Sequence, residues 1–124
     1  MFFILCLTAT SSCAVCDNEM VSESVSPNAE KKAVVFVRSC GATTGFSTHV
    51  SILDRAAGLT NEPGNVLVVD DNHGAIPIDT NHALGVRASW VADDALVIHY
   101  PSASRVFNRL SRFGSVGVSF ATTR

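Results

Sequence analysis

The strongest constraint on the fold of this chain is an alternation of apolar and polar residues with a period of two. The clearest example is 46–53, FSTHVSIL, in which Phe46 and every second residue after it are apolar or Thr, with polar residues between them. Successive side chains of a β-strand point to opposite faces, so this segment predicts a half-buried strand with His49 on the wetter face. The same period recurs over 115–120, so we expect a chain built of strands.

Further short strands are predicted along the chain, separated by turn residues. The segment 32–38, KAVVFVR, is apolar on both faces, which favours a central strand over an edge strand. Short runs at 66–69, 86–91 and 95–100 also fit strands, and the last two form a hairpin. The pattern predicts a mainly β fold, a small antiparallel sandwich or open barrel of six to eight short strands. At most one short helix is expected, near 104–112, where strand or irregular structure is slightly favoured.

Size and charge limit the organisation and the partners. The 124 residues allow one domain, and the 16% charged content is unlike a disordered tail or a coiled coil. A net charge of −2 gives no indication of a nucleic-acid partner. Charge is uneven, because 1–95 holds five basic and eleven acidic residues, a sum of −6, whereas 96–124 holds four arginines and no acid, a sum of +4. We expect the basic part either to pair with the acidic body or to meet lipid head groups or an acidic partner.

The N-terminus has features of an export signal. The run MFFILCL is apolar, is followed by small residues, and is too short to span a bilayer. The next residues, TSSC, are similar to the processing site of bacterial lipoproteins, in which the cysteine receives lipid. An ordinary buried strand over 2–7 is the alternative. We expect a signal peptide at 1–12, an acylated Cys13 with linker and first strand at 13–31, and a single β-rich domain at 32–124.

This interpretation leaves two cysteines for a disulfide. Cys6 leaves with the signal and Cys13 is acylated, so Cys16 and Cys40 remain in an oxidising compartment. They enclose 23 residues, and a bridge around such a loop contributes on the order of 3 kcal/mol. Two other roles stay open for Cys40, an inert free thiol and a catalytic thiol paired with a histidine.

Residue types that bind metals gather in one polar loop. Asp70, Asp71, His73 and His82 are candidate ligands, although their spacing matches neither a calcium-binding EF-hand nor a zinc signature. A solvated loop in which Asp and Asn form turns explains the same residues. No cofactor is expected from this pattern.

The segment 41–45, GATTG, superficially resembles a phosphate-binding loop. It lacks the Lys that follows the second glycine of such loops, and no helical pattern follows it. A tight turn leading into a strand explains it better. Thr43 and Thr44 remain candidates for a recognition loop that meets a polar ligand.

Several short motifs resemble a family of small bacterial lipoproteins and secreted proteins. The most specific is CGATTGF at 40–46, and the others are Asn18-Glu19, Ser26-Pro27-Asn28, the segment 61–66 and the Trp90–Tyr100 hairpin. Together they cover nearly all of the chain from Cys16 onward. The resemblance implies an exported protein, and it implies no chemistry, because that family has no established activity.

Two functions from different classes follow. The first is a non-enzymatic module of the cell envelope, in the periplasm or attached to a membrane only through its lipid anchor, that binds an envelope protein or a polar ligand or has a structural role. The second is a small metal-dependent or thiol hydrolase that uses the 70–82 loop and Cys40. No nucleic-acid partner is expected for either.

Overall fold

The chain folds into strands only, as the alternation predicted. The computed structural model describes residues 16–41 and 45–124, and no helix occurs among them. We expected six to eight strands, and the described residues form nine, one of which is only two residues long. They are β1 Asp17–Val25, β2 Lys31–Ser39, β3 Phe46–Asp54, β4 Leu67–Asp70, β5 Arg87–Ala92, β6 Ala95–Pro101, β7 Arg105–Arg109, β8 Arg112–Phe113 and β9 Val116–Thr123.

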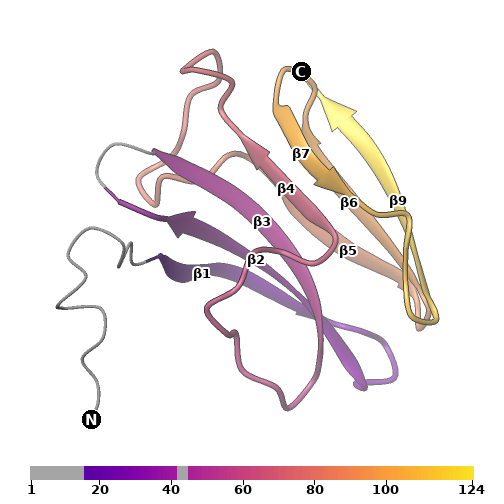
Figure 1. Cartoon of the computed structure of the whole chain (residues 1–124). Helices are drawn as coiled ribbons and strands as arrows, with labels where there is room; N and C mark the ends of the chain where they lie inside the picture. The colour runs from indigo at the N-terminus through magenta and orange to yellow at the C-terminus, as the bar shows by residue number, and fades with distance from the viewer. Residues whose placement is uncertain (1–15, 42–44) are drawn as a thin grey trace, which may run out of the picture.

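The strands form two sheets packed face to face, a small sandwich (Figure 1). Sheet A has the order β1-β2-β3-β4-β7, and sheet B has the order β5-β6-β9-β8. All pairs are antiparallel except β6 and β9, which run parallel. Neither sheet closes on itself, so the described strands form no closed barrel. The region 104–112, where a short helix was the alternative, contains β7 and the start of β8.

The main core lies between the two sheets. β2, predicted to be central, is covered on both faces and lies between β1 and β3. Val, Ile and Leu dominate the core, as expected for half-buried strands that point one face inward. Its fully buried members from sheet A include Val35, Val50 and Val69, and those from sheet B include Leu96 and Ile98.

A second, smaller cluster covers the outer face of sheet A. Phe36 and His49 lie opposite each other in the register of β2 and β3, with ring centroids 5.1 Å apart. The loop between β3 and β4 folds over them, and Asn65 ties it down through two hydrogen bonds to the backbone of Ile52. His49 is therefore only 3% exposed, and the expectation that it lies on the wetter face is wrong. Period-two alternation identifies two faces, but it cannot show that a distant loop covers the polar one.

A disulfide joins Cys16, just before β1, to Cys40, just after β2. The two cysteines flank the terminal pair of the β1–β2 ladder, Asp17 and Ser39, so the bond closes the end of this pair of strands. This confirms the predicted bridge, and no cysteine of the described residues remains free. The signal peptide predicted at 1–12 and the acylated Cys13 lie outside the described residues.

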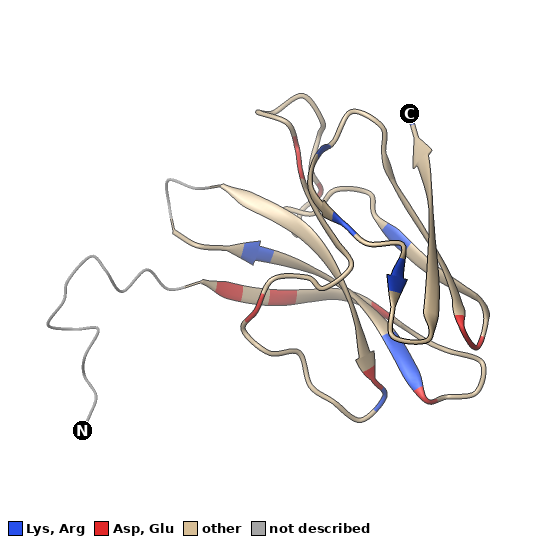
Figure 2. Cartoon of the chain, turned by 45° about the vertical axis from the view of Figure 1, so that its right-hand side comes forward, with Lys and Arg blue, Asp and Glu red and all other residues tan. Residues whose placement is uncertain are grey.

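Acidic and basic residues gather unevenly on the sandwich, although both kinds occur on both sheets. In Figure 2, red marks the beginning of β1, at one edge of sheet A, and blue follows the β7–β8 segment at the other side. One of the arginines, Arg105, pairs with Asp70 of the acidic body, with 2.6 Å between Nη2 and Oδ2. The basic part therefore makes at least one contact of the intramolecular kind that the sequence suggested.

Candidate functional site

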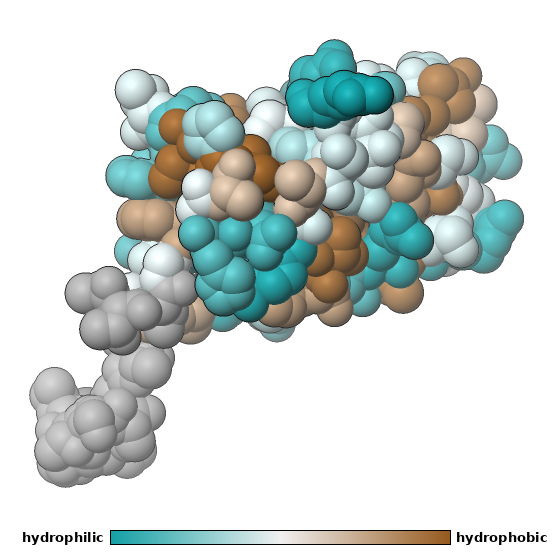
Figure 3. Space-filling view, turned by 90° about the horizontal axis from the view of Figure 1, so that it is seen from above, coloured by the Kyte–Doolittle hydropathy of each residue, from teal (hydrophilic) through white to brown (hydrophobic). Residues whose placement is uncertain are grey.

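Three adjoining clefts meet at Gly45 and Phe46, at the start of β3. Their volumes are about 540, 290 and 210 Å³, and these two residues line all three. We call them together the Phe46 groove. Figure 3, which views this end of the molecule from above Figure 1, shows apolar residues exposed beside strongly hydrophilic ones. Exposed apolar groups next to convergent polar groups are typical of a binding surface.

The largest cleft is lined in part by residues of β1, β2 and β3 that lie on the inner face of sheet A. The pairing of the strands places these lining residues side by side. Glu19 of β1 lies opposite Val37 of β2, and Ser39 of β2 lies between Asp17 of β1 and Phe46 of β3. Residues directly opposite in an antiparallel pair share a face, so the carboxylates and the aromatic ring share the face that is turned toward the core further along the strand.

His82 covers one side of the Phe46 ring. The two rings are stacked, with centroids 4.0 Å apart and planes 13° apart. Phe46 nevertheless stays 40% exposed. Among the described residues, four non-glycine residues have a left-handed backbone. Three of them, Asn72, His73 and His82, lie in the loop that holds His82, with φ of 54°, 58° and 65°. Such backbone costs energy for residues other than glycine and is concentrated at functional sites.

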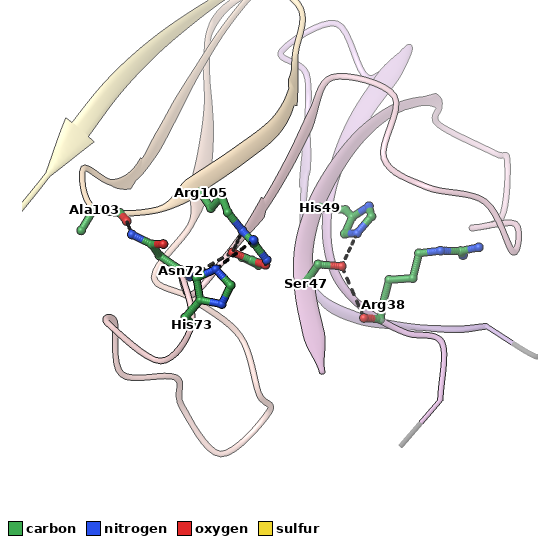
Figure 4. A network of polar contacts seen from close by, with 8 residues as sticks. Arg38, Ser47, His49, Asn72, His73, Ala103 and Arg105 are labelled. Carbon is green, nitrogen blue, oxygen red and sulfur yellow. Dashed lines mark hydrogen bonds and ion pairs between the residues drawn. The ribbon is translucent and has the colours of Figure 1, made fainter. Parts of the chain in front are cut away.

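The second and third clefts share a fixed polar network around Arg105. Its Nη2 and Nε donate to the two carboxylate oxygens of Asp70, at 2.6 and 3.2 Å. Its Nη1 donates to Nε2 of His73 at 3.1 Å, as the dashed lines of Figure 4 show, so this nitrogen carries no proton. The hydrogen bond from Arg105 is the main cause that holds the pKa of Asp70 below its ordinary value. The guanidinium also lies 4.9 Å from the ring centre of Phe107.

A second arginine, Arg38, lines the third cleft from β2. Its Nη1 donates to the side-chain oxygens of Asn18, at 2.9 Å, and Asn61, at 3.0 Å. Asn18 in turn donates to the backbone of the β3–β4 loop at Thr60 and Glu62. Neutral amides therefore position this guanidinium, and its positive charge is available to the groove.

Ser47 and His49 form a pair that resembles a catalytic serine and its base. Ser47 Oγ lies 2.7 Å from Nε2 of His49 (Figure 4). The backbone N–H of Gly64 donates to Nδ1 of the same ring at 2.8 Å, so the proton of the neutral imidazole is on Nε2. Nε2 therefore donates to Ser47 and cannot accept its proton, which is the reverse of the arrangement a nucleophilic serine needs. Burial and the charge of Arg38 lower the pKa of His49 to about 4.

The structure brings the sequence-predicted candidates to this groove but not into one metal site. Asp70, Asp71 and His73 line the second cleft, His82 lines the first, and Cys40 lines the third. Among residues 16–41 and 45–124, no three His, Cys, Asp or Glu side chains are grouped so as to hold a metal ion. The predicted recognition residues, Thr43 and Thr44, lie outside the described residues.

Sequence reasoning missed the roles of Phe46, Arg38, Arg105 and the Ser47–His49 pair. Only the Ser47–His49 pair could have been found from the local sequence, because residues two apart on a strand have side chains on the same face. Arg105 reaches Asp70 across 35 residues of chain, and Asn61 reaches Arg38 across 23. Contacts of this length depend on which strands are neighbours, which no local pattern specifies.

The lowered pKa of His49 predicts a loss of stability in acid. The folded state keeps the ring neutral down to about pH 4, whereas the unfolded chain protonates it near its ordinary value of 6.5. The contribution is therefore complete above pH 6.5 and is lost as the pH falls from 6.5 to 4, by on the order of 3 kcal/mol. The pKa values of Asp70 and Asp54 are also lowered from 3.8, but these two groups reduce the stability only when the pH falls below about 3.8. Urea unfolding at a series of pH values between 7 and 4 measures this loss of stability.

The matched variants for this measurement are His49→Gln and His82→Gln. The first removes the titrating group, so its stability is expected to vary less between pH 6.5 and 4 than that of the unsubstituted protein. The second removes an exposed ring and is expected to keep the full dependence. Identical pH profiles for all three proteins contradict the assignment to His49.

Comparisons of this chain with protein-family models, with curated proteins and with solved structures found no match. Within the described part of the chain, no helix is long and apolar enough to cross a membrane.

Proposed function

We propose that this protein is a non-enzymatic binding module of the cell envelope, a disulfide-stabilised β-sandwich that takes a polar ligand in the Phe46 groove. In this proposal residues 1–12 are removed on export and Cys13 carries the lipid anchor. The observation that carries the proposal is the bond between Cys16 and Cys40. Disulfides persist in exported proteins and are rare in the reducing cytosol.

Three features of the groove support binding over the hydrolase alternative. The sulfur of Cys40 is held in the disulfide, so it is not a free nucleophile. The proton on Nε2 of His49 prevents this ring from acting as a base for Ser47. Asp70 is already paired with Arg105 through both oxygens. Groups that are mutually satisfied in this way recognise a ligand without reacting with it.

Metabolic labelling with a fatty acid, followed by cell fractionation, tests the proposed location. The full chain is expected in the envelope fraction and labelled, because Cys13 is the acylated residue. The Cys13→Ser variant is expected to lose the label. Cys6→Ser is the matched control and keeps it, because that residue leaves with the signal. An unlabelled protein in the cytoplasmic fraction contradicts the proposal.

A further inference from the structure

The lining of the Phe46 groove carries charges of both signs in different clefts, and Asp70 is already paired with Arg105. Asp17 and Glu19 line the largest cleft, and Arg38 and Arg105 line the third. An anionic ligand that spans the groove meets the carboxylates, and a cationic one meets the guanidinium groups. The lining therefore disfavours both, and it favours a neutral ligand that donates to carboxylates and accepts from arginines along its length. Hydroxyl groups do both.

Planar apolar surfaces stand beside these polar groups. Phe46 is 40% exposed, and Phe107 is 57% exposed with Arg105 against its ring. Both rings line the third cleft. An exposed aromatic ring gains from a ligand that offers a flat face of C–H groups, because the face of the ring carries partial negative charge and the C–H hydrogens partial positive charge. The matching ligand has a ring with apolar faces and hydroxyl groups at its rim.

We propose that the ligand of the Phe46 groove is a neutral oligosaccharide. Its sugar rings stack on Phe46 and Phe107, while their hydroxyl groups bond to the carboxylates and arginines beside them. Three adjoining clefts suit a chain of several sugars better than a single ring. The inference rests on the proposed function, because it names the ligand of the site described there.

The network around Arg105 prepares the groove for such a ligand. Asp70 and His73 fix the guanidinium before any ligand arrives, and the amides of Asn18 and Asn61 do the same for Arg38. Groups that are already ordered lose little conformational entropy on binding. Weakly binding hydroxyl groups therefore suffice to hold a neutral chain in the groove.

Binding of sugar hexamers that are neutral, cationic or anionic tests the ligand class. The probes are the neutral hexamer of N-acetylglucosamine, its de-acetylated cationic counterpart, and the anionic hexamer of galacturonic acid, with neutral maltohexaose and cellohexaose as further neutral chains. Titration calorimetry and chemical-shift mapping on the full chain measure the affinity and the residues affected. At least one neutral hexamer is expected to bind more tightly than both charged ones and to shift the amide of Phe46.

Three variants at two phenylalanines control for the position of the site. Phe46→Ala is expected to weaken binding of the neutral hexamer about tenfold, since one aromatic stack is lost. Phe46→Tyr keeps a ring and is expected to keep binding. Phe113 is 37% exposed, close to the exposure of Phe46, but lies outside the three clefts. Phe113→Ala is therefore expected to bind as the unsubstituted protein does, and thermal melting confirms that each variant is folded.

Each other result overturns the inference. Tighter binding of a charged hexamer at the groove contradicts a neutral ligand while leaving a binding module in place. Binding that Phe46→Ala does not change places the ligand elsewhere. Failure of every neutral hexamer to bind contradicts the saccharide itself, and the separate fatty-acid labelling experiment then shows whether the proposed location fails as well.

Discussion

Replacing Gly64 with alanine is expected to lower the free energy of unfolding by about 3 kcal/mol, the upper part of the usual range for overpacking. A Cβ atom at this position lies 2.7 Å from the carbonyl oxygen of Leu67, and 2.8 Å from the carbonyl oxygen of Val50 and from Cβ of His49. Two of these atoms belong to the backbone of β3 and of β4, which are paired with each other. The loop must therefore move outward, because the strands cannot separate without losing their ladder.

Moving this loop also removes a hydrogen bond to a buried ring. The N–H of Gly64 is the donor to Nδ1 of His49, and a buried acceptor that loses its partner adds to the cost. The close approach of the loop is thus the reason that only glycine fits here. Urea unfolding, followed by circular dichroism, measures the change in midpoint.

Gly58 provides the matched control for this substitution. It lies in the same loop, and a Cβ atom there has no neighbouring atom within 4 Å. Gly58→Ala is expected to change the stability by less than about 0.5 kcal/mol. If Gly64→Ala unfolds at the same urea concentration as Gly58→Ala, the loop is not packed on β3 as described.

Removing the disulfide is expected to have an effect of similar size. The bond between Cys16 and Cys40 closes a loop with a sequence separation of 24, and its loss is expected to cost on the order of 3 kcal/mol. The double variant Cys16→Ser, Cys40→Ser avoids leaving one partner of this bond as a free thiol. Urea unfolding with and without a reductant measures the difference, and the full chain in reductant is expected to match the double variant.

The double variant itself is the internal control, because its midpoint is expected not to respond to the reductant. Equal midpoints for the oxidised chain and the double variant contradict a stabilising role for the bond. The β1 strand is the part expected to loosen first, since it is an edge strand paired only with β2 among the described strands.

Local patterns predicted the strands well, because alternation and two-sided apolar runs report directly on burial. Phe46–Asp54 and Lys31–Ser39 are strands close to the predicted bounds, and 104–112 contains a strand, which was favoured over a helix there. The parallel pairing of β6 with β9 was not foreseen, since it depends on the path of the chain through β7 and β8. The burial of His49 was missed for the same reason, because a loop after β3 covers it.

The site was predicted only as a set of residue types. Asp70, His73 and His82 were singled out as polar loop residues, and they do line the Phe46 groove. Their partners were not predictable, because Arg105 joins Asp70 from another strand and Phe46 meets His82 across a long loop. The cysteine pairing was easier, since the predicted loss of Cys6 with a signal peptide and the predicted acylation of Cys13 left only two cysteines.

The redox state of Cys16 and Cys40 in living cells tests export most directly. Intact cells that produce the full chain are treated with a membrane-permeant alkylating reagent, and the cysteine peptides are then weighed by mass spectrometry before and after reduction. We expect the two peptides to be joined and unalkylated before reduction, and to separate and accept a second reagent afterwards. Recovery of both cysteines as separate, alkylated peptides without any reductant contradicts an exported, disulfide-held binding module.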